Sequence, residues 1–526
     1  MIGTFCLVLH SHLPWLAHHG RWPVGEEWLY QSWAHSYLPV VEVLHTLAEE
    51  GRRDLVTLGV TPVLAAQLDD PHCLRGMHDW LGGWLLRAHG AAPRLPELAA
   101  REHRLASAAL AQFETRWRHG ASPILRALAD TGVCELLGGP ATHPFAPLLD
   151  PRVRGFALET GLADATRRIG HRPAGIWAPE CGYAPGMEEG YAAAGVRRFL
   201  VDGPALHGDT ALARTVGDSD VVCFGRDLDV TYRVWSPRKG YPGGRDYRDF
   251  HTFDHPSGLK PARVTGRTVP PERKRAYDPV RAAAAVARDA ADFVSVVRER
   301  LVGIRERLGR PGLTVAAFDT ELFGHWWHEG PAWLAAVLRA LPDAGVRVST
   351  LRGAVDAGLV TGPVRPPASS WGSGKDWRVW AGGQVADLVA QQADVQRELL
   401  AAVDRPASWC ERSETVAREQ QVRGIRSGRT GTVPIGRDPV IDALAGQALL
   451  ALSSDWAFMV SKNSAAGYAR SRADLHAGRV GELARLLRAG RRRSAARLAS
   501  GWGCDAVFGH LDARGLCAVS PAPTVR

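Results

Sequence analysis

The chain has 526 residues, a formal net charge of +9, 45% apolar residues and 23% charged residues. This composition is typical of a soluble globular protein with more than one domain. It excludes a disulfide scaffold, because the eight cysteines are scattered without a CxxC pair. No apolar run is long enough to span a membrane, and the N-terminus lacks the basic region of a signal peptide. We therefore expect a cytoplasmic protein that contacts neither a membrane nor, since its arginines are spread along the whole chain, nucleic acid.

Short runs rich in Val, Leu and Ile alternate with Ala/Leu/Arg-rich helical patterns in the first two thirds of the chain. This alternation is typical of an α/β protein with a parallel sheet or barrel. The predicted strands are Gly3–Leu9, Asp54–Val60, Cys134–Gly138, Gly175–Ala178, Arg198–Val201, Val221–Gly225, Val230–Trp235, Leu313–Phe318 and Val346–Thr350.

The remaining segments suggest how the domains are organised. A helical insertion is expected at 70–130 and a loop-rich segment at 236–280, both inside a barrel domain covering 1–360. A Pro/Gly/Ser-rich linker follows at 361–382. Residues 383–526 are then predicted to form an α-helical C-terminal domain.

Polar residues follow successive predicted strands where each strand ends, which is typical of the active face of a (β/α) barrel. These residues are His10, His12, Thr61, His143, Glu180, Asp202 and Asp319.

Two carboxylates stand out among them. Glu180 in GIWAPECGYAPGM and Asp319 in FDTELFGHWWHEG each end a buried apolar run. Two carboxylates with different pKa values can cleave a glycosidic bond, one as nucleophile and one as general acid/base. The alternative for either residue is a helix N-cap, with the polar side chain bonded to the first turn of a helix.

Several motifs occur in one order along the chain: LVLHSHLPW, ELLGGPATHPFAPLL, GIWAPECGYAPGM, YRVWSPRKGYPGG, FDTELFGHWWHEG, SSWGSGKDWRVW and SSDWAFMVSK. This set resembles the α-1,4-glucan branching enzymes of glycoside hydrolase family 57. The resemblance implies a distorted (β/α)7 barrel with a helical insertion, followed by a helical C-terminal domain. It also implies an α-1,4-glucan substrate, no metal or cofactor, and transfer of a glucan chain to a 6-hydroxyl with retention.

The resemblance further implies that Glu180 is the nucleophile and Asp319 the general acid/base. It places a set of other residues at substrate-binding positions: His10, His12, Trp22, Trp28, His143, Arg226, Trp235, Gly243, His325, Trp371, Trp380 and Asp455. Among the 18 tryptophans, five lie at helical spacing and are expected in the core: Trp33, Trp80, Trp84, Trp117 and Trp333.

Other functions remain open. A 4-α-glucanotransferase or an α-amylase of the same family is the nearest alternative, and a glucan-binding protein without activity is more distant. A metal-dependent barrel hydrolase is a further alternative, with His10, His12, Asp319 and His143 as ligands and His325 and His328 as additional ones.

One segment departs from the family pattern. Between Val201 and Phe224 the chain has a short loop without Tyr, where family members commonly carry a longer loop whose Tyr covers the site; His207 is a candidate substitute. We therefore expect branching with a narrow chain-length preference or measurable hydrolysis. Glycogen is the default substrate, and a precursor of a methylated glucan polysaccharide is an alternative.

Overall fold

The computed structural model describes residues 1–236, 239–404 and 436–517. The chain divides into two units. The barrel unit comprises Met1–Gly139 and Ala165–Trp371, and the helical unit comprises Pro140–Asp164 and Gly372–Arg526. The domain division expected from the sequence did not anticipate that 140–164 groups with the C-terminal helices.

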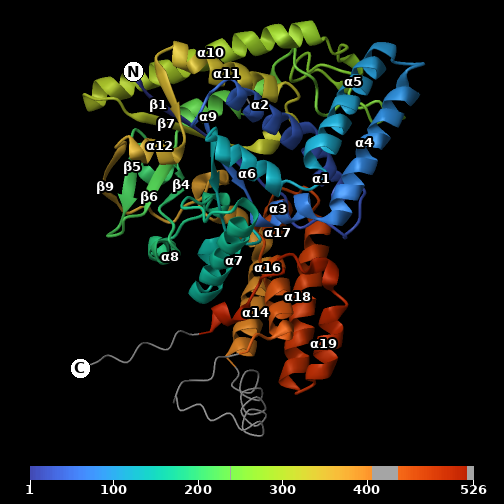
Figure 1. Ribbon diagram of the computed structural model, residues 1–526, viewed down its shortest axis with the longest axis vertical. Coiled ribbons are helices and arrows are strands. Elements are labelled where there is room, and N and C mark those ends of the chain that lie inside the picture. The colour runs from blue at the N-terminus through green and yellow to red at the C-terminus, as the bar shows by residue number, and fades with distance from the viewer. Residues whose placement is uncertain (237–238, 405–435, 518–526) are drawn as a thin grey trace. The chain divides into compact units, whose positions relative to one another are not determined.

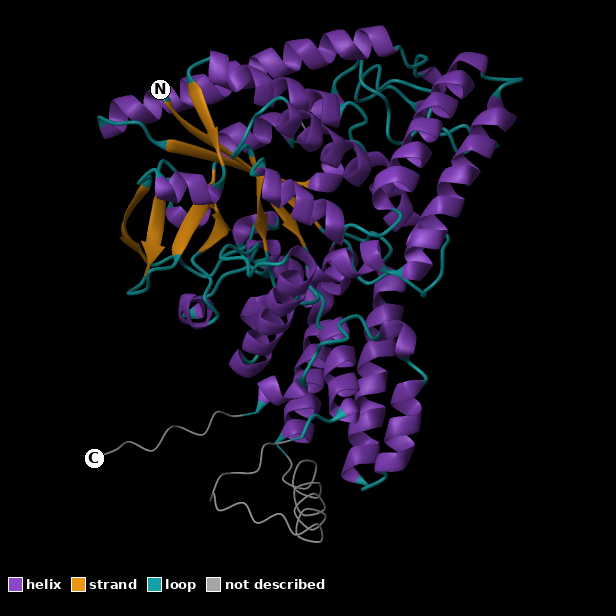
Figure 2. Cartoon of the chain, viewed as in Figure 1, coloured by secondary structure: helices purple, strands orange, loops and turns teal. Residues whose placement is uncertain are grey.

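The strands of the barrel unit form two sheets (Figure 2). The first has the order β3-β2-β1-β7, with β8 also paired to β1, and the second has the order β4-β6-β5-β9. Their bounds are β1 Gly3–Ser11, β2 Val56–Val60, β3 Cys134–Leu137, β4 Arg198–Asp202, β5 Ala213–Val216, β6 Val222–Arg226, β7 Leu313–Asp319, β8 Val346–Ser349 and β9 Val360–Val364.

A short parallel segment joins the two sheets. Gly175 pairs with Arg198 at the start of β4, and Ile176 pairs with Gly138 just after β3. On the other side, the backbone N–H of Asp227 donates to the carbonyl of Val315 in β7 at 2.8 Å. β1, β2, β3, this segment, β4, β6 and β7 thus follow one another around a distorted (β/α)7 barrel, as the sequence predicts.

Strand β1 lies at the centre of the first sheet and all nine of its residues are buried. It pairs in parallel with β2 and β7, and its register with β7 runs from Thr4 opposite Leu313 to His10 opposite Asp319. A strand covered on both faces needs a continuous apolar run, and TFCLVL supplies it.

Helices surround these strands in the barrel unit (Figure 1). The expected insertion is the hairpin of α4 and α5, whose long helices pack side by side. The helix bounds are α1 Glu26–Ser32, α2 Leu38–Glu49, α3 Pro62–Asp69, α4 Pro71–Ala91, α5 Pro96–Gln112, α6 Ser122–Thr131, α8 Met187–Ala193, α9 Leu228–Val234, α10 Pro279–Leu308, α11 Gly330–Asp343 and α12 Leu351–Asp356.

The expected strand Val230–Trp235 is wrong, because most of it belongs to α9. Asp227 caps this helix: its carboxylate accepts hydrogen bonds from the backbone N–H groups of Asp229 and Val230. This cap outweighs the β propensity of VTYRVW. Strands β5 and β9 were not predicted; both are short and partly exposed.

The helical unit has a core of its own, to which Val153, Leu399, Leu444, Leu449 and Leu483 contribute. Its helices are α7 Pro151–Ile169 (which runs past the unit boundary), α13 Arg378–Ala381, α14 Ala386–Val403, α16 Pro439–Ala451, α17 Ser454–Ser461, α18 Ala466–Arg488 and α19 Arg492–Ser500. None of the helices in the described part of the chain is long and apolar enough to cross a membrane.

Candidate active site

The carboxyl ends of the barrel strands bring four of the expected polar residues together in pairs. His10 at the end of β1 lies opposite Asp319 at the end of β7. Asp202 at the end of β4 lies opposite Arg226 at the end of β6. Arg226 Nε donates to Asp202 Oδ1 at 2.8 Å in buried surroundings, which fixes the guanidinium group.

Glu180 follows the short parallel segment in an unusual backbone conformation. Its φ of +62° and ψ of 17° lie in the left-handed region, which non-glycine residues seldom adopt outside functional sites. The side chain is only 7% exposed. Trp371 Nε1 donates to Glu180 Oε2 at 2.8 Å, and the backbone N–H of Trp371 donates to the Glu180 carbonyl at 2.8 Å. Trp371 therefore holds both the carboxylate and the backbone of Glu180.

Aromatic rings surround this carboxylate. His10 stacks on Trp177 with centroids 4.3 Å apart and an angle of 13° between the rings. Trp177 meets Trp371 edge to face at 4.9 Å, and Arg226 Cζ lies 5.2 Å above the Trp371 ring. The packed rings exclude water from one side of Glu180 and leave the indole N–H little freedom to turn away.

Burial raises the pKa of Asp319 from 3.8 to about 6, although the positive charges of Arg226 and His12 favour the ionised form. About half of Asp319 is consequently protonated at pH 6 and about a tenth at pH 7. A carboxyl group in this state can donate a proton to a leaving oxygen and take one back afterwards.

A second buried carboxyl group, that of Glu321, lies two residues after Asp319 in the chain. Glu321 Oε1 accepts hydrogen bonds from Tyr37 Oη at 2.5 Å and from the backbone N–H of His12 at 3.1 Å. Burial and the neighbouring Asp319 raise the pKa of Glu321 to about 8. Glu321 is therefore mainly neutral at pH 7 and adds no full negative charge beside Asp319. The sequence gives no signal for Tyr37, which lies inside a helical pattern.

The histidines of the metal alternative contact different groups. His12 Nδ1 is 3.0 Å from Thr61 Oγ1. The ring of His325 meets Phe250 edge to face at 5.4 Å, whereas that of His328 meets Tyr277 at 5.9 Å. His325 and His328 therefore pack against separate aromatic rings, and burial lowers the pKa of His325 to about 3, which keeps its imidazole neutral.

Three tryptophans of the expected cleft have their rings at least partly accessible. Trp22 is 76% exposed and Trp235 is 47% exposed, while Trp28 is half-buried. Such rings can stack on sugars. A Cβ atom on Gly243 would lie 2.5 Å from the Arg267 guanidinium group, which would have to move aside to admit a side chain.

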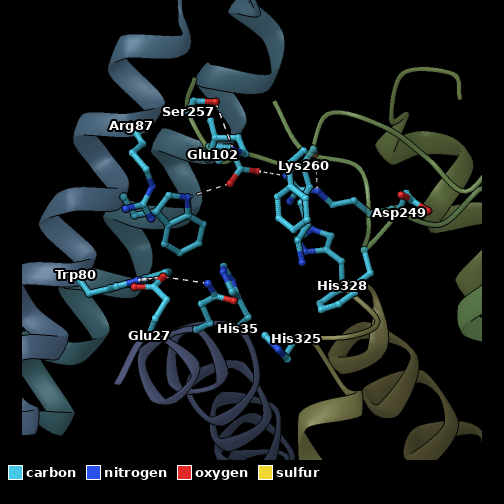
Figure 3. A pocket seen from close by; sticks show the side chains of 18 of the residues that line it. Glu27, His35, Trp80, Arg87, Glu102, Asp249, Ser257, Lys260, His325 and His328 are labelled. Atoms are coloured by element: carbon cyan, nitrogen blue, oxygen red, sulfur yellow. Dashed lines mark hydrogen bonds and ion pairs between the residues drawn. The ribbon is translucent and has the colours of Figure 1, made fainter. Parts of the chain in front are cut away.

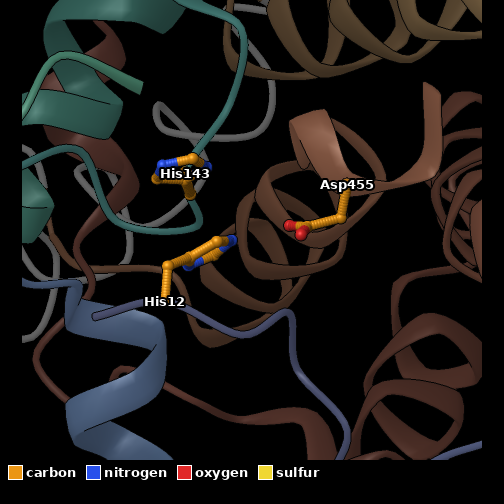
Figure 4. A group of neighbouring side chains, drawn as sticks. All are labelled: His12, His143 and Asp455. Carbon is orange, nitrogen blue, oxygen red and sulfur yellow. The ribbon is translucent and has the colours of Figure 1, made fainter. Parts of the chain in front are cut away.

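Two further predicted residues belong to the helical unit (Figure 4). His143 has a left-handed φ of +56°, and its Nδ1 lies 3.0 Å from Ser454 Oγ. Asp455 Oδ2 accepts a hydrogen bond from Ser453 Oγ at 2.5 Å. These contacts fix His143 and Asp455 at neighbouring points of one unit.

Trp380 was expected to line an aromatic cleft, but its ring lies in the packed interior. Its ring is 1% exposed and stacks on Phe145 at 4.7 Å and 8°. A Cβ atom on Gly372 would lie 2.8 Å from the same ring. Trp380 is thus packed within the helical unit and offers no face to a sugar. The five tryptophans expected in the core are buried, as predicted: Trp33, Trp80, Trp84, Trp117 and Trp333.

Comparison with known proteins identifies the family. Residues 6–240 match "Glycosyl hydrolase family 57", and residues 429–515 match "1,4-alpha-glucan branching enzyme, C-terminal". A probable 1,4-alpha-glucan branching enzyme of Mycobacterium tuberculosis is 58% identical over 98% of this chain and 98% of its own length. The chain belongs to glycosyl hydrolase family 57. The resemblance noted from the motifs is therefore confirmed.

Solved structures agree with the fold. The branching enzyme of Thermococcus kodakaraensis, solved with glucose and additives, has a TM-score of 0.88 at 27% identity and covers 99% of this chain and 98% of its own. The α-amylase AmyC of Thermotoga maritima has a TM-score of 0.82 at 24% identity, covering 99% of this chain and 100% of its own. At this low identity, the similarity to AmyC supports the fold but says nothing about the activity of this chain.

Proposed function

We propose that this protein is a retaining 1,4-α-glucan branching enzyme, with Glu180 as nucleophile and Asp319 as general acid/base. The observation that carries the proposal is the buried Glu180 carboxylate held by the Trp371 indole at 2.8 Å, in a barrel whose β7 ends at Asp319. The comparisons support branching rather than amylase or 4-α-glucanotransferase activity, because the C-terminal region matches a segment described for branching enzymes.

In the first step, a carboxylate oxygen of Glu180 attacks the anomeric carbon of an α-1,4-linked glucose, and the bond to the leaving oxygen breaks. The Trp371 N–H fixes the orientation of the carboxylate through its contact with Oε2. The product is a glycosyl ester on Glu180, which preserves the donor chain for transfer.

Asp319 protonates the leaving oxygen in the same step. Its raised pKa of about 6 supplies a proton at mildly acidic to neutral pH. In the second step the ionised Asp319 removes a proton from the 6-hydroxyl of an acceptor glucan, and that oxygen attacks the anomeric carbon. The two inversions together retain the α configuration.

Water competes with the acceptor in this second step. The segment between β4 and β6 contributes β5 to the second sheet, and His207 within it is exposed and has a left-handed φ of +53°. We propose that this short segment covers the glycosyl ester incompletely, which gives measurable hydrolysis or short transferred chains.

An amylose assay followed by debranching tests the function. The expected products contain new α-1,6 links and a narrow distribution of branch lengths. Products without α-1,6 links would refute branching, and shortened linear chains alone would indicate an amylase. Stoichiometric zinc in the purified protein, with activity lost in chelator, would instead support the metal-dependent alternative.

The natural substrate is proposed to be a glycogen-like α-1,4-glucan or the precursor of a methylated glucan polysaccharide. Comparing kcat/KM for amylose and for partly methylated maltooligosaccharides distinguishes them. A methylated 6-hydroxyl cannot accept a chain, so branching of the methylated substrate is confined to its unmodified glucose units.

A further inference from the structure

The turn that carries Glu180 has a backbone conformation that must be maintained by its surroundings. Glu180 and the following residue, Cys181, both have left-handed φ values, +62° and +50°. Neither residue is glycine, so this conformation is strained and persists only where neighbouring contacts fix it. We call residues 179–186 the nucleophile turn; it leads directly into α8 (Figure 1).

Residues 369–371 hold one side of the nucleophile turn through backbone hydrogen bonds. The Tyr183 N–H donates to the Ser369 carbonyl at 3.0 Å, and the Ser369 N–H donates to the Tyr183 carbonyl at 3.1 Å. The Trp371 N–H, which donates to the Glu180 carbonyl, adds a third bond to this short antiparallel pairing. The position of Glu180 therefore depends on where Tyr183 is held, three residues further along the chain.

Glu188 holds the side chain of Tyr183 and the end of the turn. Its Oε2 atom accepts a hydrogen bond from Tyr183 Oη at 2.6 Å and another from the backbone N–H of Gly186 at 3.0 Å. Tyr183 and Glu188 are both buried. The Tyr183 ring also stacks on Phe199 of β4, with centroids 5.8 Å apart and an angle of 22° between the rings. Tyr183 thus connects the nucleophile turn to a barrel strand and to Glu188.

Glu188 is buried without a positively charged partner. Elsewhere in the barrel unit, the buried Glu102 forms an ion pair with Arg248 at 2.7 Å (Figure 3), and Glu135 forms one with Arg198 at 2.5 Å. No Lys, Arg or His within the described residues lies at ion-pair distance from Glu188, whose charge is instead favoured by its place in the first turn of α8. A buried carboxylate without a counter-ion is costly, which points to a role for its two hydrogen bonds beyond stability.

We infer that Tyr183 and Glu188 are positioning residues that hold the Glu180 carboxylate in its geometry for attack on the anomeric carbon. They act through the backbone of the nucleophile turn. Loss of either hydrogen bond lets the turn relax toward ordinary φ values, which moves the carboxylate away from the line of attack. This inference rests on the proposed function, in which Glu180 is the nucleophile.

The first test removes the phenol of Tyr183 and keeps its ring. Tyr183→Phe is expected to lower kcat on amylose about tenfold and to leave KM within about twofold of the wild-type value, because the nucleophile is displaced and the substrate contacts are kept. Tyr247→Phe is the matched control: Tyr247 Oη donates to the buried carboxylate of Asp289, also at 2.6 Å, on α10.

Both variants lose one hydrogen bond between a tyrosine and a buried carboxylate, so both are expected to lower the unfolding temperature. Only Tyr183→Phe should lower kcat. Equal kcat in the two variants overturns the inference. Glu188→Gln keeps an oxygen that can accept both bonds and is expected to retain kcat within about threefold, whereas Glu188→Ala should lose about tenfold or more. Equal kcat in these two variants also overturns the inference.

A second test uses α-maltosyl fluoride as donor, because fluoride leaves without protonation and its displacement depends on the nucleophile alone. Tyr183→Phe is expected to lower kcat on the fluoride about as much as on amylose, whereas Asp319→Asn should lower it far less on the fluoride. A Tyr183→Phe variant that is slow on amylose but has wild-type kcat on the fluoride overturns the inference, since its nucleophile is then in place. Full activity of Glu180→Gln overturns the proposed function instead.

Discussion

Trp371→Phe removes one hydrogen bond from the candidate active site while keeping an aromatic ring in place. In the wild-type protein the Trp371 indole donates to Glu180 Oε2 at 2.8 Å. The ring also packs on Trp177 at 4.9 Å and lies 5.2 Å below Arg226 Cζ. Phenylalanine retains most of this packing but lacks the N–H group, so the Glu180 carboxylate loses a donor that fixes its orientation.

The expected size of the effect follows from the chemistry of this bond. A hydrogen bond to a charged group in buried surroundings contributes roughly 1.5–3 kcal/mol. If that contribution is lost from the transition state, kcat falls about ten- to one-hundred-fold, since 1.4 kcal/mol corresponds to about one factor of ten. The KM for amylose should change less, because the bond orients the nucleophile rather than the substrate.

The assay measures kcat for release of reducing ends and formation of α-1,6 links, alongside thermal unfolding. Trp333→Phe is the matched control: Trp333 is 1% exposed in α11, and its indole nitrogen has no hydrogen-bond partner among the described residues. The control should lower the unfolding temperature and leave kcat unchanged. Wild-type kcat in a folded Trp371→Phe variant would refute the positioning role.

Four further predictions follow from the site. Glu180→Gln and Asp319→Asn should each lower kcat at least about a thousandfold with the fold intact; a fully active variant of either contradicts the assignment. Because Asp319 must be protonated in the first step and its pKa is about 6, kcat/KM should fall as pH rises above about 6, and a flat profile between pH 5 and 8 would contradict this. The pKa of Asp319 is higher in the folded protein than its ordinary 3.8, so ionisation of Asp319 lowers the free energy of unfolding as pH rises from about 4 to 6. Asp319→Asn removes this ionisation and should raise the free energy of unfolding at pH 7 by up to about 3 kcal/mol, measured by urea denaturation. Tyr37→Phe should cost about 1–3 kcal/mol of stability because the buried Glu321 loses its donor; an unchanged denaturation midpoint argues against that bond.

Part of the fold could be read from local pattern. Apolar runs such as that of β1 predict buried parallel strands, and polar residues directly after them predict the active face. The strand prediction was wrong at Val230–Trp235, where the N-cap residue Asp227 stabilises a helix. It also failed at β5 and β9, whose few residues carry too weak an apolar alternation to be recognised.

The site shows the same division between local and long-range information. The motifs single out Glu180 and Asp319 without any knowledge of their neighbours. They do not reveal that Tyr37 reaches Glu321, because residues 284 apart in sequence meet only after the barrel closes. They also placed Trp380 in a cleft, whereas packing against Phe145 buries its ring.

The sequence by itself determined the family, the alternation of strands and helices in the barrel, and the two candidate catalytic carboxylates. These features depend on short motifs and on residues that directly follow strands. Only the tertiary structure decided which group donates a hydrogen bond to Glu180 and why the pKa of Asp319 is raised. Both features depend on burial and on contacts between distant segments, which arise only when the barrel strands pack together.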